Sequence, residues 1–330
     1  MKVLSWIKNL DGCSYHRVFM PNNHINAEVR TVSNLKEEDL AWCDILHYSR
    51  HVMISPSFIA QQAKKYNVKV VVDTDDWWEV GKDHPKYNLW KKSDVGFQIR
   101  QHLIYADAVI CTSDKLARAV PNKNVYVIPN ALAYETGQFR EHELSPSDRV
   151  RLVYASSAMN YSNTFLIANA MKKIDLPVEW VIAGYVEGDV YDVITRNLTG
   201  DGKIPYSTIE WSGVEDYMSG YKGDILVVPS KASEFNSYKS NIKALEAAAL
   251  NIPILVSKAE PYLGLPVNYF TGEKDFISEL TKLVESQEYR KECAAKNRSY
   301  CLENYDIVKW GEKRLKIYEE ILQRSDSHSR

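Results

Sequence analysis

Residues 224–257 read DILVVPSKASEFNSYKSNIKALEAAALNIPILVS and join two strand-like runs through a helical segment. The runs DILVVPS and IPILVS are short, apolar and rich in β-branched residues, which is typical of buried strands. Between them, ALEAAAL consists of strong helix formers. A strand, a helix and a second strand in direct succession form the unit from which parallel sheets are built. The stretch therefore predicts an α/β fold with a doubly wound parallel sheet.

The same alternation of strands and helices runs through the whole chain. Strand-like runs are KVLSWI, DILHYS, KVVVDT, AVICTS and VYVIPN in the first half, and RLVYASS, VEWVIAG, TIEWSG, DILVVPS and IPILVS in the second. Between the halves, residues 134–149 are polar and lack apolar periodicity, which indicates a junction. We therefore predict two Rossmann-like domains, at 1–145 and 149–305. The amphipathic segment DIVKWGEKRLKIYEEILQ predicts a closing helix at 306–325.

Composition limits the classes of function. The chain has 330 residues, 45% of them hydrophobic, and 41 Lys and Arg against 43 Asp and Glu give a formal charge of −2. Such a balance gives no global attraction to nucleic acid or to a membrane. Five cysteines without a CxxC pair indicate reduced thiols rather than disulfides or a zinc site.

Targeting signals are not evident in the sequence. The N-terminal run MKVLSWIKNLDGC is too short in apolar residues for a signal peptide, and no segment reaches the roughly 18 to 20 apolar residues of a membrane span. No basic amphipathic segment suggests docking to a membrane either. We expect a cytoplasmic protein, monomeric or weakly dimeric.

Three charged residues of the opening stretch fall at helical spacing. Lys239, Lys243 and Glu246 occupy positions i, i+4 and i+7, so a continuous helix would place them on one face. A solvated charged stripe is one interpretation. Against it, the same face continues to Leu250, and the segment follows a buried-type strand, where a helix N-terminus attracts anions. The pattern favours a nucleotide site, with lysines at the diphosphate and the carboxylate at sugar hydroxyls.

The run VVPS…EFNSYKSNIKALEAAALNIPILVS resembles the donor-binding segment of nucleotide-sugar glycosyltransferases of the GT-B fold, in the retaining family 4 group. The resemblance implies that Glu246 binds the donor ribose. Eight residues before it, where the family carries another acid, this chain has Tyr238, so Asn236 or Glu234 is implied to replace that acid.

The KSNxK pattern resembles a branch of this family in which the lysines lie beside the donor phosphates. It implies that Lys239 and Lys243 stabilise the leaving group and that Ser240 and Asn241, between them, belong to the donor site. The family's usual Arg and Lys near the start of the second domain are missing from YASSAMNYSNTF. The two lysines of the KSNxK pattern are therefore expected to supply the missing charge.

Two further segments extend the resemblance. The end of the family's first domain is similar to ADAVICTSDKLARAVPNKNVYVIPNALAYE, with Asn130 in its IPN position. The family segment whose backbone contacts the nucleobase is similar to IEWSGVEDYMSGYKGDILVVPS, which places those contacts near Val214 and Tyr217. The resemblance implies a GT-B fold whose last helix crosses back to domain one. It also implies a nucleoside diphosphate sugar as donor, most simply a UDP-sugar, with no tightly bound cofactor and no required divalent metal.

The first domain offers two groups of candidates. DGCSYHRVFMPNNH follows the first strand, and the resemblance implies that this loop faces the cleft, with Gly12 and Arg17 contacting donor or acceptor and His16 taking part in catalysis. Ordinary loop chemistry and a structural histidine are the alternatives. Arg50 and His51, at the end of another strand, are weaker candidates.

VVVDTDDWWEV places Asp73, Asp75 and Asp76 at the end of an apolar strand. Burying carboxylates at such a position costs free energy unless they form ion pairs, remain in contact with solvent or take part in function. A DxD pattern is also typical of metal-dependent GT-A enzymes, but the donor signature lies in the other half of the chain. The strand end resembles that of relatives of the KSNxK branch, which carry similar acids, and this implies acceptor binding or proton handling for Asp75 and Asp76. Helix capping is the structural alternative.

The resemblance therefore implies a glycosyltransferase that moves a hexose or pentose to a hydroxyl, with retention of configuration as in the family. As acceptor, the GCSYHRVFMPNN opening resembles that of phage-encoded members of the family, which implies hydroxymethylated cytosine in phage DNA. However, residues 1–148 hold 18 Lys and Arg against 18 acids, so this half of the chain has no net positive charge that would attract DNA. A saccharide or lipid-linked saccharide of surface polysaccharide synthesis is the alternative acceptor. A nucleotide-sugar epimerase or a non-catalytic binding protein is the alternative of another class.

Overall fold

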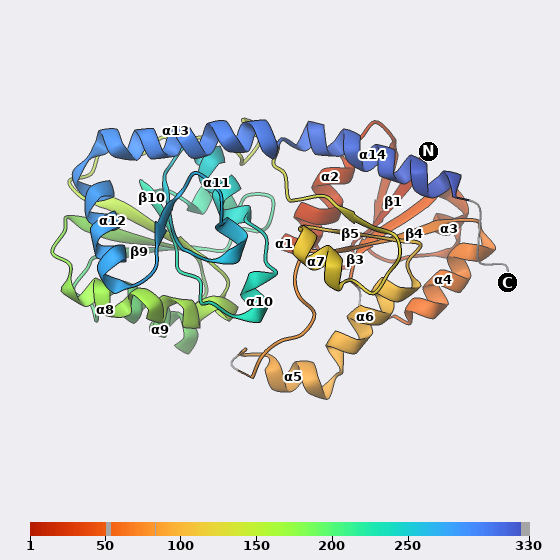
Figure 1. Ribbon diagram of the computed structural model, residues 1–330, viewed down its shortest axis with the longest axis horizontal. Coiled ribbons are helices and arrows are strands. Elements are labelled where there is room, and N and C mark those ends of the chain that lie inside the picture. The colour runs from red at the N-terminus through yellow and green to blue at the C-terminus, as the bar shows by residue number, and fades with distance from the viewer. Residues whose placement is uncertain (51–53, 83, 325–330) are drawn as a thin grey trace. The chain divides into compact units, whose positions relative to one another are not determined.

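The computed structural model describes residues 1–50, 54–82 and 84–324. Contacts divide the chain into two compact units (Figure 1). Unit 1 comprises Met1–Ala131, Tyr238–Ser240 and Ile307–Arg330, and unit 2 comprises Leu132–Ser237 and Asn241–Asp306. Unit 2 thus begins shortly before the predicted junction, and Lys239 and Ser240 of the KSNxK pattern belong to unit 1 together with the preceding Tyr238.

Unit 1 is built on a six-stranded parallel sheet with strand order β2-β1-β3-β4-β5-β6. The strands are β1 (Lys2–Trp6), β2 (Glu28–Val32), β3 (Ile45–Ser49), β4 (Lys69–Thr74), β5 (Ala108–Cys111) and β6 (Val125–Val127). The crossover segments contain α3 (Glu37–Trp42), α4 (Pro56–Lys65), α5 (Tyr87–Lys92), α6 (Val95–Tyr105) and α7 (Asp114–Ala119). The central strands are almost continuously apolar because helices cover both faces of the sheet.

The chain between β1 and β2 is helical and positions several predicted site residues. It forms α1 (Gly12–Ser14), a π-helical turn η1 (Tyr15–Phe19) and α2 (Met20–Asn22). The side chain of Asp11 caps this segment by accepting a hydrogen bond from the Ser14 N–H at 2.8 Å. A single π-helical turn inside a helix shifts the register of the side chains that follow it.

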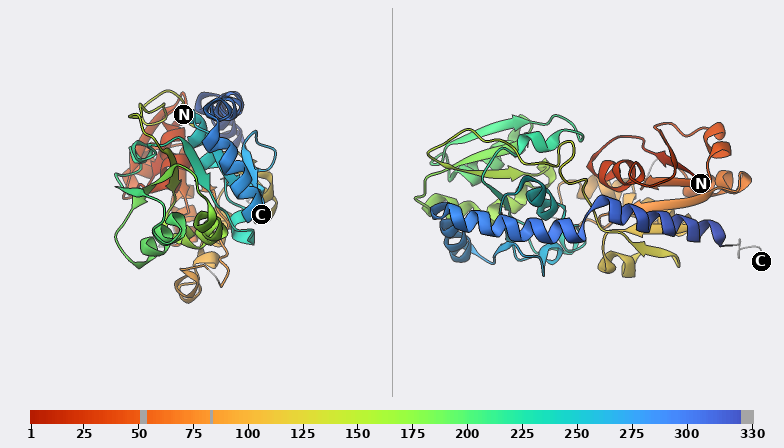
Figure 2. Two further views of the ribbon diagram at one scale, coloured as in Figure 1. Left: turned by 90° about the vertical axis from the view of Figure 1, so that its left-hand side faces the viewer. Right: turned by 90° about the horizontal axis from the view of Figure 1, so that it is seen from above.

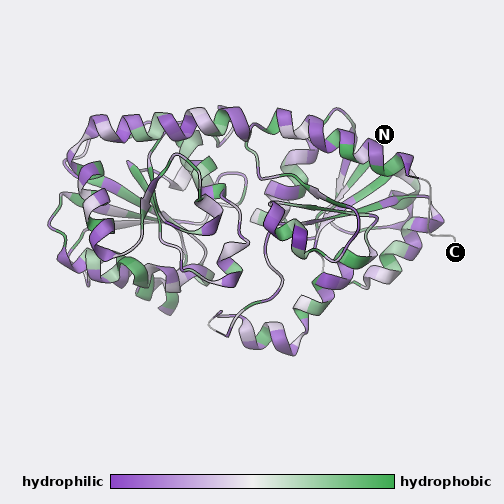
Figure 3. Cartoon of the chain, viewed as in Figure 1, coloured by the Kyte–Doolittle hydropathy of each residue, from purple (hydrophilic) through white to green (hydrophobic). Residues whose placement is uncertain are grey.

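The last helix of the chain, α14 (Ile307–Gln323), packs on the sheet of unit 1, as Figures 1 and 2 show. Ile317, Tyr318 and Ile321 are buried against Val3 and Val71 of the central strands. Close approach is made possible by a glycine, since a Cβ on Gly311 would lie 2.8 Å from the carbonyl oxygen of His24. Figure 3 shows hydrophilic and hydrophobic residues alternating along α14, as the predicted amphipathic pattern requires.

Unit 2 repeats the architecture with a parallel sheet of order β12-β11-β10-β7-β8-β9. Its strands are β7 (Val150–Ala155), β8 (Val178–Tyr185), β9 (Tyr206–Glu210), β10 (Ile225–Val228), β11 (Ile254–Ser257) and β12 (Asn268–Phe270). Its α-helices are α8 (Phe165–Lys173), α9 (Asp189–Thr199), α10 (Glu234–Ser237), α11 (Ile242–Leu250), α12 (Glu273–Glu285) and α13 (Gln287–Asn304). The opening stretch is the unit β10–α11–β11, so the predicted parallel fold is confirmed.

One local prediction is wrong. Lys239 does not lie on the helix of Lys243 and Glu246, because α11 begins only at Ile242. The preceding residues make contacts of another kind: Tyr238 stacks on Trp77, and Asn130 donates a hydrogen bond to Ser240 at 2.7 Å. These contacts hold the backbone outside helical geometry, so the three charges do not share one helix face.

Candidate functional site

At the carboxyl end of β4, Asp73 forms a closed ion-pair network with Arg17. The Arg17 guanidinium donates to Asp73 through Nε at 2.8 Å and Nη2 at 3.2 Å, and to Asn130 Oδ1 at 3.0 Å and the carbonyl of Ile128 at 2.8 Å. Arg17 is 1% exposed and Asp73 is fully buried. Because the guanidinium is used inside unit 1, the structure argues against the predicted contact of Arg17 with a donor.

The other side of Asp73 faces the last helix of the chain. His47 Nε2 lies 3.7 Å and Arg314 Nη2 3.8 Å from Asp73 Oδ2. Burial lowers the pKa of His47 to about 4, and the positive charge of Arg314 acts in the same direction. Burial alone would raise the pKa of Asp73, but Arg17, His47 and Arg314 together outweigh burial, and the pKa is lowered. The network therefore consists of an ionised aspartate, two arginines and a neutral histidine, and it ties α14 to the sheet.

Two residues further along, Asp75 and Asp76 form a second, more open cluster. Arg50 Nη2 lies 3.4 Å from a carboxylate oxygen of each. The side chains of Asp75 and Asp76 are 13% and 26% exposed. Burial and the neighbouring Asp75 raise the pKa of Asp76, and Arg50 opposes the shift.

Cys13 completes a trio whose ligand atoms lie within 4.8 Å of one another, a spacing that could hold a metal ion. The surrounding charges do not fit one. Arg50 already supplies a cation to both carboxylates, and burial raises the pKa of the Cys13 thiol well above its usual value, with Asp75 adding to the shift. A thiol that stays protonated is a poor metal ligand.

Lys239 lies beside this acid pair. Burial lowers the pKa of Lys239, while the charges of Asp76 and Asp75 oppose the shift. The preceding Tyr238 fixes the segment, with its ring stacked on Trp77 at a centroid distance of 4.3 Å and an interplanar angle of 10°. The alternative of helix capping by the two aspartates is wrong, since the next helix begins at Tyr87.

The remaining candidates of unit 1 are placed differently. His16 is buried, 8% exposed, with its ring edge-on to Tyr15 at 5.1 Å. Gly12 is exposed at the first position of α1. His51 lies outside the described residues. A buried imidazole and an exposed glycine in one helical turn form no joint site.

In unit 2, the predicted carboxylate and lysine of α11 form a hydrogen-bonded cluster. Lys243 Nζ lies 2.7 Å from Glu246 Oε2 and 2.5 Å from the Tyr221 hydroxyl, and the Tyr217 hydroxyl donates to Glu246 Oε1 at 2.8 Å. Glu246 is 2% exposed, while 21% of the Lys243 side chain is exposed. A buried carboxylate held by a lysine and a tyrosine is not a solvated stripe, so that interpretation is excluded for this pair.

Other predicted donor residues of unit 2 make internal hydrogen bonds. Asn236 donates to the carbonyl of Lys231 at 3.0 Å, and Asn241 donates to the Tyr305 hydroxyl at 2.9 Å. Glu234 is exposed at the start of α10. Asn236 therefore holds the chain before the KSNxK segment and Asn241 holds it within that segment, while Glu234 offers its carboxylate to solvent.

The loop of Val214 and Tyr217 is held by a residue that the sequence analysis missed. Gln138 donates to the carbonyl of Val214 at 2.8 Å and accepts from the Met218 N–H at 3.2 Å. Next to this loop, Trp211 is 52% exposed and stacks on Tyr217 at a centroid distance of 6.1 Å. The WSG pattern could have indicated the exposed indole, but no local signal indicates Gln138, which lies far away in the sequence.

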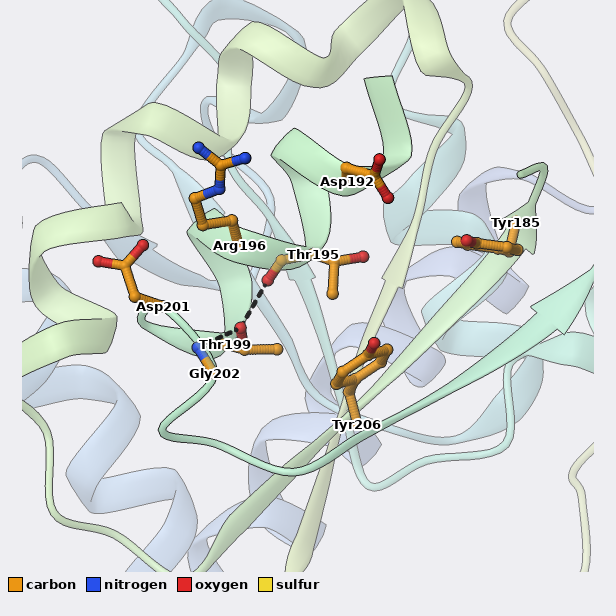
Figure 4. Close-up of a pocket in the computed structure, with 8 residues that line it drawn as sticks. All are labelled: Tyr185, Asp192, Thr195, Arg196, Thr199, Asp201, Gly202 and Tyr206. Carbon is orange, nitrogen blue, oxygen red and sulfur yellow. Dashed lines mark hydrogen bonds between the residues drawn. The ribbon is translucent and has the colours of Figure 1, made fainter. Parts of the chain in front are cut away.

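Unit 2 also has an open groove of about 440 Å³ between α9 and β9 (Figure 4). Figure 4 shows two tyrosine rings beside charged and hydroxyl side chains. The groove is lined by Tyr185, Asp192, Thr195, Arg196, Thr199, Asp201, Gly202 and Tyr206. None of the predicted site residues lines it.

The two parallel six-stranded sheets and the C-terminal helix define the GT-B fold. A scan against protein-family models finds no match, and no curated protein matches by sequence. Solved structures do match. A glycosyltransferase from Rickettsia africae has a TM-score of 0.66 and 12% identity, over 98% of this chain and 99% of that one.

Two further solved structures cover nearly the whole chain. Anabaena HepE in complex with UDP-glucose has a TM-score of 0.69 and 10% identity, over 97% of this chain and 99% of HepE. AviGT4, a glycosyltransferase involved in avilamycin A biosynthesis, has a TM-score of 0.59 and 12% identity, over 97% of each chain. At these identities the similarity shows the fold.

Among the described residues, no helix combines the length and the apolarity that crossing a bilayer requires.

Proposed function

We propose that this chain is a glycosyltransferase that transfers a sugar from a UDP-sugar to an acceptor hydroxyl. The observation that carries the proposal is the Lys243–Glu246 cluster in the first turns of α11. The start of a helix favours anions, and a lysine there adds a full positive charge. The complex of HepE, a structure of the same fold, with UDP-glucose supports the choice of donor.

In this proposal Glu246 accepts hydrogen bonds from the donor ribose, and Lys243 stabilises the negative charge that develops on the leaving diphosphate. Both groups are already oriented, since Tyr217 and Tyr221 hydrogen-bond to them. Orientation before binding is what makes electrostatic stabilisation effective in catalysis. Backbone groups near Val214 and Tyr217 read the base, and Ser240 and Asn241 lie in the same segment as the lysines.

For unit 1 we propose a role in holding the acceptor. Asp75 and Asp76 are partly exposed carboxyl groups that can accept hydrogen bonds from acceptor hydroxyls, and Lys239 beside them supplies a cation. Transfer with retention needs no protein nucleophile if the leaving phosphate accepts the acceptor proton. Positioning of the two substrates then supplies most of the protein's contribution.

The acceptor itself is the finer part of the proposal. Duplex DNA bearing hydroxymethylcytosine was the first expectation from the sequence. The exposed basic and apolar side chains of α5 and α6 instead favour the saccharide or lipid-linked saccharide alternative.

The direct test is thermal unfolding in the presence of UDP-glucose, UDP, ADP and GDP. Specific binding raises stability by about 2.7 kcal/mol when the ligand is at 100 times its dissociation constant. We expect stabilisation by the uridine ligands, lost in Glu246→Gln and reduced in Lys243→Met. Lys258→Met, which changes an exposed lysine of the same unit, is the matched control.

Absence of stabilisation by every nucleotide would overturn the donor site. Incubation with UDP-glucose alone separates the remaining alternatives: slow hydrolysis supports a transferase, a changed sugar configuration supports an epimerase, and binding without turnover supports a non-catalytic protein.

A further inference from the structure

The two helices that follow β4, α5 and α6, carry a basic and apolar surface, and we propose that this surface docks on an anionic lipid bilayer. α5 buries none of its residues. Figure 1 shows it standing apart from the strands of unit 1. Trp90 of α5 is partly buried against the core of unit 1, but packing on the core does not account for the other apolar side chains of the helix.

The apolar part of the surface is formed by side chains that point away from the core. α6 buries Gly96, Ile99 and Leu103. On the opposite face, Phe97 and Ile104 are 55% and 44% exposed. They are seven residues apart and therefore lie one above the other on the helix. Leu89 of α5 is 60% exposed, so large apolar side chains of two adjacent helices face solvent.

Basic residues lie in the same segment of the chain as these apolar side chains. Lys86, Lys91, Lys92 and Arg100 are exposed, and Asp94 is the acid among residues 86–105, which gives a net charge of +3. The other residues up to 148 hold 14 Lys and Arg against 17 acids. Within the described parts of the chain, no acidic partner is found for Lys86, Lys92 or Arg100. The positive charge of the first half is thus concentrated on this surface.

The chemistry of these side chains fits a lipid surface better than a nucleic acid. Nucleic-acid contacts consist mainly of hydrogen bonds and ion pairs with phosphates, for which exposed Leu, Phe and Ile side chains are of little use. Interfacial helices combine Lys and Arg with Leu and Phe, because the cations meet anionic headgroups while the apolar side chains enter the acyl boundary.

The surface is firmly attached to the chain beside the acid pair. Trp90 of α5 donates a hydrogen bond from Nε1 to the carbonyl of Trp78 at 2.9 Å. The start of α6 packs on the same carbonyl, since a Cβ on Gly96 would lie 2.8 Å from it. Trp78 follows Asp76 by two residues. This last step rests on the proposed function: the acceptor whose hydroxyl group binds to Asp75 and Asp76 is then a lipid-linked molecule.

The test is sedimentation of the full-length protein with vesicles of phosphatidylcholine, alone or mixed with phosphatidylglycerol. We expect binding to the mixed vesicles that weakens as salt is raised, and little binding to phosphatidylcholine alone. Each lysine near an anionic surface contributes roughly a fivefold change in partitioning. Lys91→Glu with Lys92→Glu should therefore reduce binding by more than tenfold, and Leu89→Ser with Phe97→Ser should also reduce it.

Phe165→Ser is the matched control, since Phe165 of unit 2 is 52% exposed, and it should bind as wild type does. No binding of the wild-type protein to the mixed vesicles would overturn the proposal. So would unchanged binding in both double variants, or retention on duplex DNA without binding to vesicles. Nucleotide-dependent stabilisation, measured on the same samples, reports on the proposed transferase separately, because vesicle binding requires no donor.

Discussion

Asp73 and the Asp75–Asp76 pair lie two residues apart at the end of β4, yet their surroundings differ in almost every respect. Asp73 is fully buried between Arg17 and Arg314, with His47 beside it. Asp75 and Asp76 share one arginine and remain partly exposed. Acids that look alike in sequence are thus divided into one that holds the fold and two that are available to a ligand.

The largest expected effect concerns the buried acid. Asp73→Asn keeps the side-chain shape but leaves Arg17 and Arg314 buried without their counter-charge, which typically costs about 3 to 5 kcal/mol. Denaturant unfolding of both proteins measures the loss. Asp75→Asn is the control and should change the unfolding free energy by less than about 1 kcal/mol, because its site is partly solvated. Equal losses in the two variants would remove the distinction between the clusters.

The second prediction concerns the pH dependence of stability. His47 has a folded pKa of about 4 against an ordinary value of 6.5. As the pH falls, His47 therefore takes up a proton in the unfolded chain before it does so in the folded protein. The free energy of unfolding should decrease between about pH 6.5 and about pH 4. The shift corresponds to about 3 kcal/mol. The measurement is the unfolding free energy as a function of pH.

His47→Asn is the matched variant and should flatten this part of the pH profile. Asp76 should affect the pH dependence of stability in the opposite direction, because its pKa is raised in the folded state. As the pH falls through that pKa, the carboxylate takes up a proton and the free-energy cost of burying its charge beside Asp75 is removed. Identical pH slopes for wild type and His47→Asn would show that His47 does not titrate between the two states.

Much of the fold could be predicted from local sequence. Ten strand-like runs and an amphipathic last helix led to two parallel sheets, because the period of apolar residues and the length of each run are local properties. A solvated charged stripe at Glu246 was disfavoured for the same kind of reason, since its helix face continues into Leu250. The roles of these residues toward a donor stay predictions.

The rest depended on contacts that no local pattern encodes. Lys239 was placed on a helix because its spacing fits one, but the stacking of Tyr238 on Trp77 overrides that propensity. Arg17 was expected to contact a ligand, while its partners Asp73 and Asn130 are distant in sequence. The α5–α6 surface escaped notice because α5 is only six residues long, too short to show an amphipathic period.

The smallest expected effect concerns the stacking of Tyr238 on Trp77, next to the cluster of Asp75 and Asp76. Tyr238→Leu removes the stack on Trp77 and should cost about 1 kcal/mol of stability, whereas Tyr238→Phe keeps a ring and should cost almost nothing. If the stack also positions Lys239 beside Asp75 and Asp76, Tyr238→Leu should lower kcat for transfer while Tyr238→Phe leaves it unchanged. Unfolding and steady-state kinetics of the two variants decide between packing alone and packing that orders a functional lysine. Equal kcat values in both variants would make the stack structural and would leave the charge of the acid pair to hold Lys239.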